Sequence, residues 1–352
     1  MDHKKTLSDL INSLIRQNGP DIHLGNGRKP YIRIAGQLIA LSNEPIYTKD
    51  DMEGILKELV GVDKFTRFLE NQESDFAYAS GDTIRLRGNA FFQKGRLSIA
   101  LRLIPRTQTV AELRLPPIIE TFARKQQGFF LVVGPVGQGK STTMAAMIDL
   151  INKERSVHII TIEDPIEFVH TSQQSIVDQR EVGIDTKDFH SSLTSIFRED
   201  ANVIMIGEMR DADTIATAVT AAETGHLVIS TLHTNTASQT IERIIDSFPG
   251  DQQDQIRVQL AGSLLGIFSQ RLVPRIAGGR VPAYEILINN NAVANLIREK
   301  RTHEIDVIIE TGFGEGMIDM NRSLIELVRT GEISMESARQ YSYNPKALDQ
   351  LL

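Results

Sequence analysis

Two patterns of hydrophobic and polar residues divide the 352-residue chain near residue 117. The first block opens with apolar residues at helical spacing, and Gly19-Pro20 should end that helix. A second helical stripe covers 49–69. Period-two alternation predicts antiparallel strands over 31–35, 38–40, 75–79, 83–92 and 97–104. The block therefore predicts an N-terminal α+β domain over 1–105, followed by a linker over 106–117.

From residue 118 onward, short apolar runs alternate with helical stretches. Buried strands are predicted over 129–133, 157–162, 203–206 and 227–232, with helices over 141–153 and 211–223. This alternation is typical of a mainly parallel sheet covered by helices, in which ligands bind at the carboxyl ends of the strands. The predicted fold class is therefore α/β, with the larger domain spanning 118–352.

Composition excludes several kinds of protein. The formal net charge is −7 and the chain has no cysteine, so disulfide frameworks, thiol nucleophiles and cysteine-ligated metal sites are excluded. The apolar runs are shorter than the roughly 18 residues of a membrane-spanning helix, and the N-terminus lacks the pattern of a signal peptide. We therefore expect a cytoplasmic protein, and the acidic balance argues against a nucleic-acid partner.

A phosphate-binding loop directly follows the predicted strand at 129–133. Its residues, Gly134-Pro135-Val136-Gly137-Gln138-Gly139-Lys140-Ser141, match G-x-x-x-x-G-K-[ST] between a strand and a helix, which is the setting such a loop requires. Backbone N–H groups of this loop surround nucleotide phosphates, and the helix N-terminus adds positive potential. We predict that the loop and Thr142 bind ATP, that Lys140 reaches the β- and γ-phosphates, and that Ser141 binds Mg²⁺.

Two acidic residues follow strands of the same predicted sheet. Glu208 comes shortly after the strand at 203–206, and Glu163 follows the strand at 157–162. Hydrolysis of a nucleotide needs a carboxylate on the metal side and a group that orients or deprotonates water. Both residues suit these tasks, but their spacing does not decide which one supports Mg²⁺ and which one handles the water.

Two histidines flank the strand at 227–232. His226 precedes this strand and His233 follows it. An imidazole at either position could sense the γ-phosphate or carry its state to a neighbouring subunit. A structural hydrogen bond explains either histidine equally well, so both readings stay open here.

The four motifs together resemble the Walker A, Asp, Walker B and His boxes of secretion and pilus ATPases. The sequence is most similar to the type IV pilus retraction ATPases (PilT-like), and the similarity extends into both the N-terminal and C-terminal parts. The boxes and flanking motifs lie at 134–141, 161–170, 206–211, 221–228 with 231–234, 21–24 with 31–34, and 292–299.

The resemblance implies a PAS-like N-terminal domain, a RecA-like P-loop ATPase domain and a homo-hexamer. It also implies that Glu163 activates water, that Glu208 supports Mg²⁺, and that Arg87 and Arg102 face the phosphates. Plain surface charge on a sheet is the alternative for these arginines. The implied partner is an inner-membrane platform protein, through which a cytoplasmic motor would be held peripherally at the membrane.

Retraction is not the only function compatible with these motifs. The alternatives are an assembly or secretion ATPase of a type II or type IV system and, less favoured, a RecA-like nucleic-acid motor. Assembly enzymes usually carry a longer N-terminal region and often a four-cysteine metal loop, both missing from this sequence. Val136 and Gln138 in the loop, and Val293 and Ala294 near the end, depart from the pattern of the retraction enzymes.

Overall fold

The computed structural model describes residues 2–17, 19–34, 37–81, 84–104 and 106–351. Residues 35 and 105, where a predicted strand and the predicted N-terminal domain end, and residue 83, where a predicted strand begins, lie outside the described residues. The chain forms two compact units. One comprises Met1–Arg106 with Glu167–Val169, and the other comprises Thr107–Ile166 with His170–Leu352.

The first unit contains a six-stranded antiparallel sheet in the order β3-β2-β1-β6-β5-β4. Its strands are β1 (Asp21–Gly25), β2 (Tyr31–Ile34), β3 (Gln37–Ala40), β4 (Glu73–Ser80), β5 (Ile84–Gln93) and β6 (Arg96–Ile104). The five strands predicted by alternation are confirmed. The pattern did not predict β1, which joins the two halves of the sheet by pairing with both β2 and β6.

Two helices supply the core of this unit, α1 (His3–Arg16) and α2 (Lys49–Asn71). The predicted stripe on α1 is buried at Leu7, Leu10, Ile11 and Leu14. A capping box in which Thr48 and Asp51 bond each other's backbone begins α2. Both helices bury their apolar faces with the sheet in one cluster, so the sheet's other face carries its polar residues.

The second unit is built on a seven-stranded sheet in the order β13-β12-β7-β11-β10-β8-β9. The strands are β7 (Gly128–Val133), β8 (His158–Glu163), β9 (Ile176–Glu181), β10 (Val203–Ile206), β11 (Leu227–Leu232), β12 (Leu264–Pro274) and β13 (Arg280–Ile288). All neighbours pair in parallel except β12 with β13. The mainly parallel sheet is therefore confirmed.

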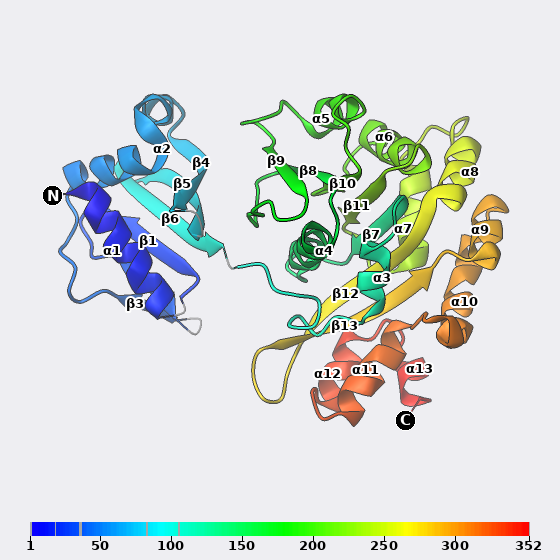
Figure 1. Ribbon diagram of the computed structural model, residues 1–352. Coiled ribbons are helices and arrows are strands. Elements are labelled where there is room, and N and C mark those ends of the chain that lie inside the picture. Colours follow the sequence, from blue (N-terminus) through cyan, green and yellow to red (C-terminus); the bar gives the residue numbers. More distant parts are fainter. Residues whose placement is uncertain (1, 18, 35–36, 82–83, 105, 352) are drawn as a thin grey trace. The chain divides into compact units, whose positions relative to one another are not determined.

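Helices cover both faces of this sheet (Figure 1). Side chains of α3 (Ile118–Ala123) and α4 (Lys140–Glu154) share one apolar cluster with the first face. The other face packs with α5 (Phe189–Ile196), α6 (Ala212–Glu223), α7 (Ala237–Asp246), α8 (Gln253–Ser263), α9 (Asn291–Arg298) and α10 (Ile305–Thr311). Val293 and Ala294 of α9 are buried in this second cluster.

Three short helices at the end of the chain form what we call the C-terminal bundle: α11 (Met320–Arg329), α12 (Met335–Tyr341) and α13 (Pro345–Asp349). Figure 1 shows them gathered beside the β12–β13 hairpin. Their apolar side chains share a separate small core with Val273 of β12 and with Val281 and Ala283 of β13. The bundle is therefore seated on the edge strand β13 and on its neighbour β12.

The segment that we expected to be a linker packs with the second unit from Thr107 onward. Val110 and Leu115 are buried in the same apolar cluster as α3 and α4. Arg114 forms an ion pair with Glu332 at 2.7 Å, just after α11. Among the residues that the structure describes, no helix has the length and apolar character to cross a bilayer.

Candidate nucleotide-binding site

The phosphate loop connects β7 to α4 and needs glycine at its two ends. Gly134 has φ 144° and Gly139 has φ 82°, conformations that L side chains rarely adopt. A Cβ at Gly134 would lie 2.4 Å from the carbonyl oxygen of Gln270. Since Gly139 is the N-cap of α4 and has no capping side chain, the first turn of the helix opens toward the loop. The local geometry is that of an anion-binding loop.

Lys140 lies folded across this loop. Its ammonium donates to the carbonyl oxygens of Gly134 at 2.8 Å and Pro135 at 2.9 Å. It also lies 3.2 Å from Nδ1 of His233. Only 8% of the residue is exposed, so its charge is held at the loop rather than in solvent.

His233 bridges Lys140 and Glu208. Its Nε2 lies 3.2 Å from Oε2 of Glu208, while Nδ1 faces the lysine. An ammonium has only donors, so Nδ1 accepts and the neutral ring carries its proton on Nε2, which donates to the carboxylate. One imidazole thus joins the loop after β7 to the loops after β10 and β11.

Glu208 has a second partner, which is cationic. Arg210 forms an ion pair with its other carboxylate oxygen, and this hydrogen bond raises the pKa of the arginine. The side chain of Arg210 is 65% exposed, whereas that of Glu208 is 19% exposed. Glu208 is therefore held between two partners: His233, which also contacts Lys140, and Arg210, which is exposed to solvent.

Glu163 is buried at the end of β8, with 7% of the residue exposed. Its Oε1 accepts from Thr161 Oγ1 at 2.6 Å and from Gln179 Nε2 at 3.0 Å. The Gln179 carbonyl accepts the backbone N–H of His170, so its amide nitrogen must face Glu163. The carboxylate is therefore oriented by β8 and β9 together, beside the strand that leads to Glu208.

His226 is not part of this assembly. It precedes β11, at the amino edge of the parallel sheet, whereas His233 follows the strand at the carboxyl edge. The six residues of β11 separate them by roughly 20 Å. Nδ1 of His226 lies 2.9 Å from the carbonyl oxygen of Ala221, and its ring meets Phe197 edge-on at 5.7 Å. Within this chain, the contacts of His226 are those of a histidine with a structural role.

Arg87 and Arg102 lie opposite each other on β5 and β6 of the first unit. Both are exposed. Nε of Arg102 donates to Oδ1 of Asp21 at 2.7 Å, and this hydrogen bond raises the pKa of the arginine. Their predicted role at a phosphate stays a prediction, because it depends on surroundings outside their own unit.

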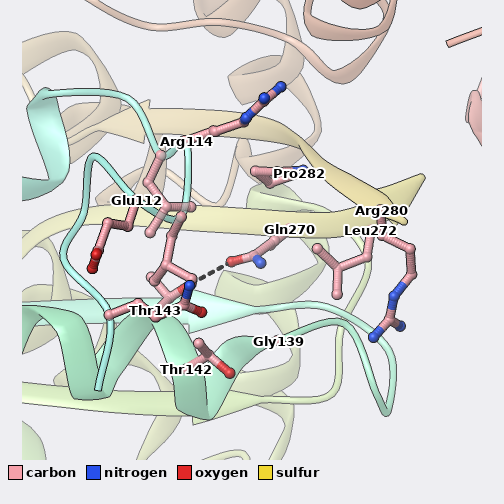
Figure 2. Close-up of a pocket in the computed structure, with 12 residues that line it drawn as sticks. Glu112, Arg114, Gly139, Thr142, Thr143, Gln270, Leu272, Arg280 and Pro282 are labelled. Carbon is pink, nitrogen blue, oxygen red and sulfur yellow. Dashed lines mark hydrogen bonds between the residues drawn. The ribbon is translucent and has the colours of Figure 1, made fainter. Parts of the chain in front are cut away.

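A pocket of about 380 Å³ adjoins the loop on the side of Thr142 and Thr143 (Figure 2). Its lining comes from the loop and α4, from β12 and β13, and from the segment after Thr107. A hydrogen bond of 2.6 Å joins Thr143 Oγ1 to Gln270 Oε1, and Arg280 extends toward the loop. The volume falls within the range of small-ligand pockets.

Three glutamines shape the site: Gln138 was predicted only as a member of the phosphate loop, and Gln179 and Gln270 were not predicted. Gln138 accepts the N–H of Leu272 at 2.6 Å and so ties the loop to β12. Gln270 packs on both ends of the loop, and Gln179 orients Glu163. Gln138 lies within the recognised motif, but at a position where the motif allows any residue type. The other two lie on strands that the sequence pattern did not reveal, so only the fold brings them in.

Comparison with known proteins places these features in a family. Residues 84–280 match the model of the type II/IV secretion system proteins. The type IV pilus retractation ATPase PilT of Pseudomonas aeruginosa is 40% identical over 341 residues, covering 97% of this chain and 99% of that protein. The uncharacterised YggR of Escherichia coli K12 is also 40% identical, over 93% of this chain and 99% of its own length.

A solved structure agrees with the sequence relatives. The crystal structure of the pilus retraction motor PilT with bound ADP is 43% identical, with a TM-score of 0.91, and the match covers 97% of this chain and 98% of that one. The chain therefore belongs to the type II/IV secretion system ATPase family, within which it is PilT-like.

Proposed function

We propose that this protein is an ATP-hydrolysing motor that powers type IV pilus retraction, the removal of pilin subunits on which twitching motility depends. The observation that carries the proposal is the meeting of Lys140, His233, Glu208 and the phosphate loop at one edge of the sheet. The near full-length similarity to PilT supports retraction over secretion or assembly.

Two neighbouring parts of the site would bind the nucleotide, one for the phosphates and one for the nucleoside. The phosphates would lie on the loop, where the open first turn of α4 and the buried Lys140 supply positive charge. The pocket beside Thr142 and Thr143 would take the nucleoside, because it opens directly from the loop and offers polar groups beside an apolar wall of Leu113 and Leu272.

The donor groups of the site suit Mg²⁺. Among the residues that the structure describes, no three His, Asp or Glu side chains gather as a metal site. Mg²⁺ commonly takes only one or two protein ligands and completes its shell with phosphates and water. Ser141 and Glu208 would hold the ion here, and when bound it would neutralise charge that develops on the phosphates.

Glu163 is the proposed group that orients and deprotonates the attacking water. Its carboxylate is held by two hydrogen bonds at the sheet edge where the loop lies, which preserves its direction. Arg87 and Arg102 are the proposed cations that stabilise the γ-phosphate, supplied by the PAS-like N-terminal domain. Their fixed charge and forked donors suit a phosphate.

We further propose a homo-hexamer that works at the inner membrane through a platform protein of the pilus machine. A head-to-tail contact that places one subunit's arginines at the next subunit's nucleotide would repeat until a ring closes. Membrane contact would be peripheral and through the partner, as expected for a cytoplasmic motor. No nucleic acid is part of this function.

Two experiments test the proposal. Mg²⁺-dependent ATP turnover should be lost in Lys140→Ala and kept in Lys153→Ala, which removes an exposed lysine from the same helix. Undiminished hydrolysis in Lys140→Ala would place the activity elsewhere. Deletion of the gene should then leave surplus fibres that do not retract, whereas a strain without fibres would favour the assembly function.

A further inference from the structure

One backbone carbonyl near the site is held from two sides. The carbonyl oxygen of Asn235 accepts from Ser269 Oγ on β12 and from the hydroxyl of Tyr343, each at 2.5 Å. Tyr343 lies between α12 and α13, so this second bond comes from the C-terminal bundle. A segment that follows β11 is thereby tied to a part of the chain more than a hundred residues away.

Arg271 fixes the direction of the tyrosine's hydrogen bond. Its Nε donates to the Tyr343 hydroxyl at 3.1 Å, and its guanidinium lies 4.7 Å from the centre of the ring. The same guanidinium donates to Oδ1 of Asn235 at 3.2 Å. Since the hydroxyl accepts from the arginine, its single proton is directed at the Asn235 carbonyl.

The held segment begins at the histidine of the site. His233 stands two residues before Asn235, a chain length of roughly 7 Å, and contacts Lys140 and Glu208. Beyond Asn235 the chain enters α7, whose first residue, Ala237, donates its N–H to the buried Glu285 at 2.7 Å. The backbone of residues 233–236 is thus anchored just beyond His233, and this backbone carries the imidazole that contacts Lys140 and Glu208.

We propose that Tyr343 is a positioning residue of the nucleotide site, through which the C-terminal bundle sets the position of His233. The hydroxyl holds Asn235, Asn235 holds the segment, and the segment places the imidazole between Lys140 and Glu208. This inference rests on the proposed ATPase function. It assigns to the bundle a direct effect on turnover, in addition to its packing on β12 and β13.

Tyr343→Phe removes the hydroxyl and keeps the ring on Arg271. We expect turnover of ATP to fall about 2- to 10-fold, the effect of one neutral hydrogen bond, with little change in KM. Tyr341→Phe is the matched control, because Tyr341 packs in the same bundle but takes no part in the contacts of Asn235. Thermal unfolding of both variants measures any loss of packing.

A double-mutant cycle with His233→Ala separates positioning from stability. Single-turnover release of phosphate is followed in both single variants and in the double variant. If Tyr343 acts through His233, Tyr343→Phe causes no further loss once the imidazole is gone. Equal loss in both backgrounds, or full turnover in Tyr343→Phe, would overturn the inference and leave the ATPase function standing. No turnover in the unsubstituted protein would overturn both.

Discussion

The two ends of β11 place the same residue type in two different settings. At the amino end, His226 contacts a backbone carbonyl of α6 and the edge of a phenylalanine ring. At the carboxyl end, His233 joins a lysine to a glutamate. The difference follows from the sheet. Loops that leave parallel strands gather at the carboxyl edge, so their side chains meet there. Helices end at the amino edge instead. The candidate catalytic side chains therefore lie at the carboxyl edge, and side chains with structural contacts lie at the amino edge.

The largest expected effect tests whether the carboxyl edge performs the chemistry. Glu163→Gln should reduce turnover by about 10³-fold, because the amide keeps the shape of the carboxylate but accepts no proton. ATP binding measured by calorimetry should persist beside the lost phosphate release. Glu223→Gln, at the end of α6, is the control and should leave turnover intact. Normal turnover in Glu163→Gln would remove its assigned role.

Ionisation of Glu285, at the carboxyl edge, should lower the free energy of unfolding at high pH. Burial raises the pKa of Glu285 to about 7, helped by Asp306 and Asp319 and opposed by the Ala237 N–H. The pKa of Glu285 in the folded protein therefore exceeds the ordinary value of 4.5. The contribution of Glu285 to the free energy of unfolding is fully present below pH 4.5. About 3 kcal/mol of it is lost as the pH rises through 7.

Glu285→Gln keeps an oxygen for the Ala237 N–H and cannot ionise. We therefore expect the free energy of unfolding at pH 8 to rise by up to about 3 kcal/mol, with no change at pH 4.5. Denaturant unfolding at the two pH values measures this difference. An equal shift at both values would mean that packing, and not ionisation, is responsible.

Replacing each of the two histidines by alanine sharpens the comparison. His233→Ala should lower turnover about 10-fold, because Lys140 and Glu208 lose their shared partner. His226→Ala should leave turnover within about 2-fold and lower the free energy of unfolding by about 1 kcal/mol, through loss of one hydrogen bond. Steady-state rates and chemical denaturation of both variants provide the test. Equal losses of turnover in His233→Ala and His226→Ala would mean that the two edges of the sheet do not differ in function.

The smallest effect concerns the shape of the loop. Gln138→Ala breaks the bond to the Leu272 N–H and frees the loop from β12. ADP affinity should weaken about 3-fold, while the rate at saturating ATP changes less. Val136→Ala serves as the control, because residue Val136 in the same loop is 80% exposed. Unaltered ADP affinity in Gln138→Ala would show that the loop holds its own shape.

Local features of the site could be predicted from the sequence, because each lies within a few residues of a recognisable strand. The phosphate loop and Glu208 follow continuous apolar runs, and Glu163 follows the mainly apolar run at 157–162. Because His226 precedes its strand and His233 follows it, the direction of a parallel strand already places His226 at the amino edge and His233 at the carboxyl edge.

Other parts depend on contacts between distant segments, which no local pattern encodes. β12 begins directly after α8 with no turn signal between them, so the pattern placed neither Gln270 on β12 nor Glu285 on β13, the strand paired with it. The segment after Thr107 was predicted as a linker because it contains few apolar residues, yet Val110 and Leu115 suffice to seat it in the core. β1 is only five residues long and still joins the two halves of its sheet.

The exposed Val136 also makes the loop accessible to chemical labelling. Since the chain contains no cysteine, Val136→Cys would create a single attachment point for a fluorophore. The dye would lie on the loop that we propose holds the phosphates, so its emission should follow nucleotide arrival and release in real time. A protein of this composition needs no background substitutions for such an optical reporter.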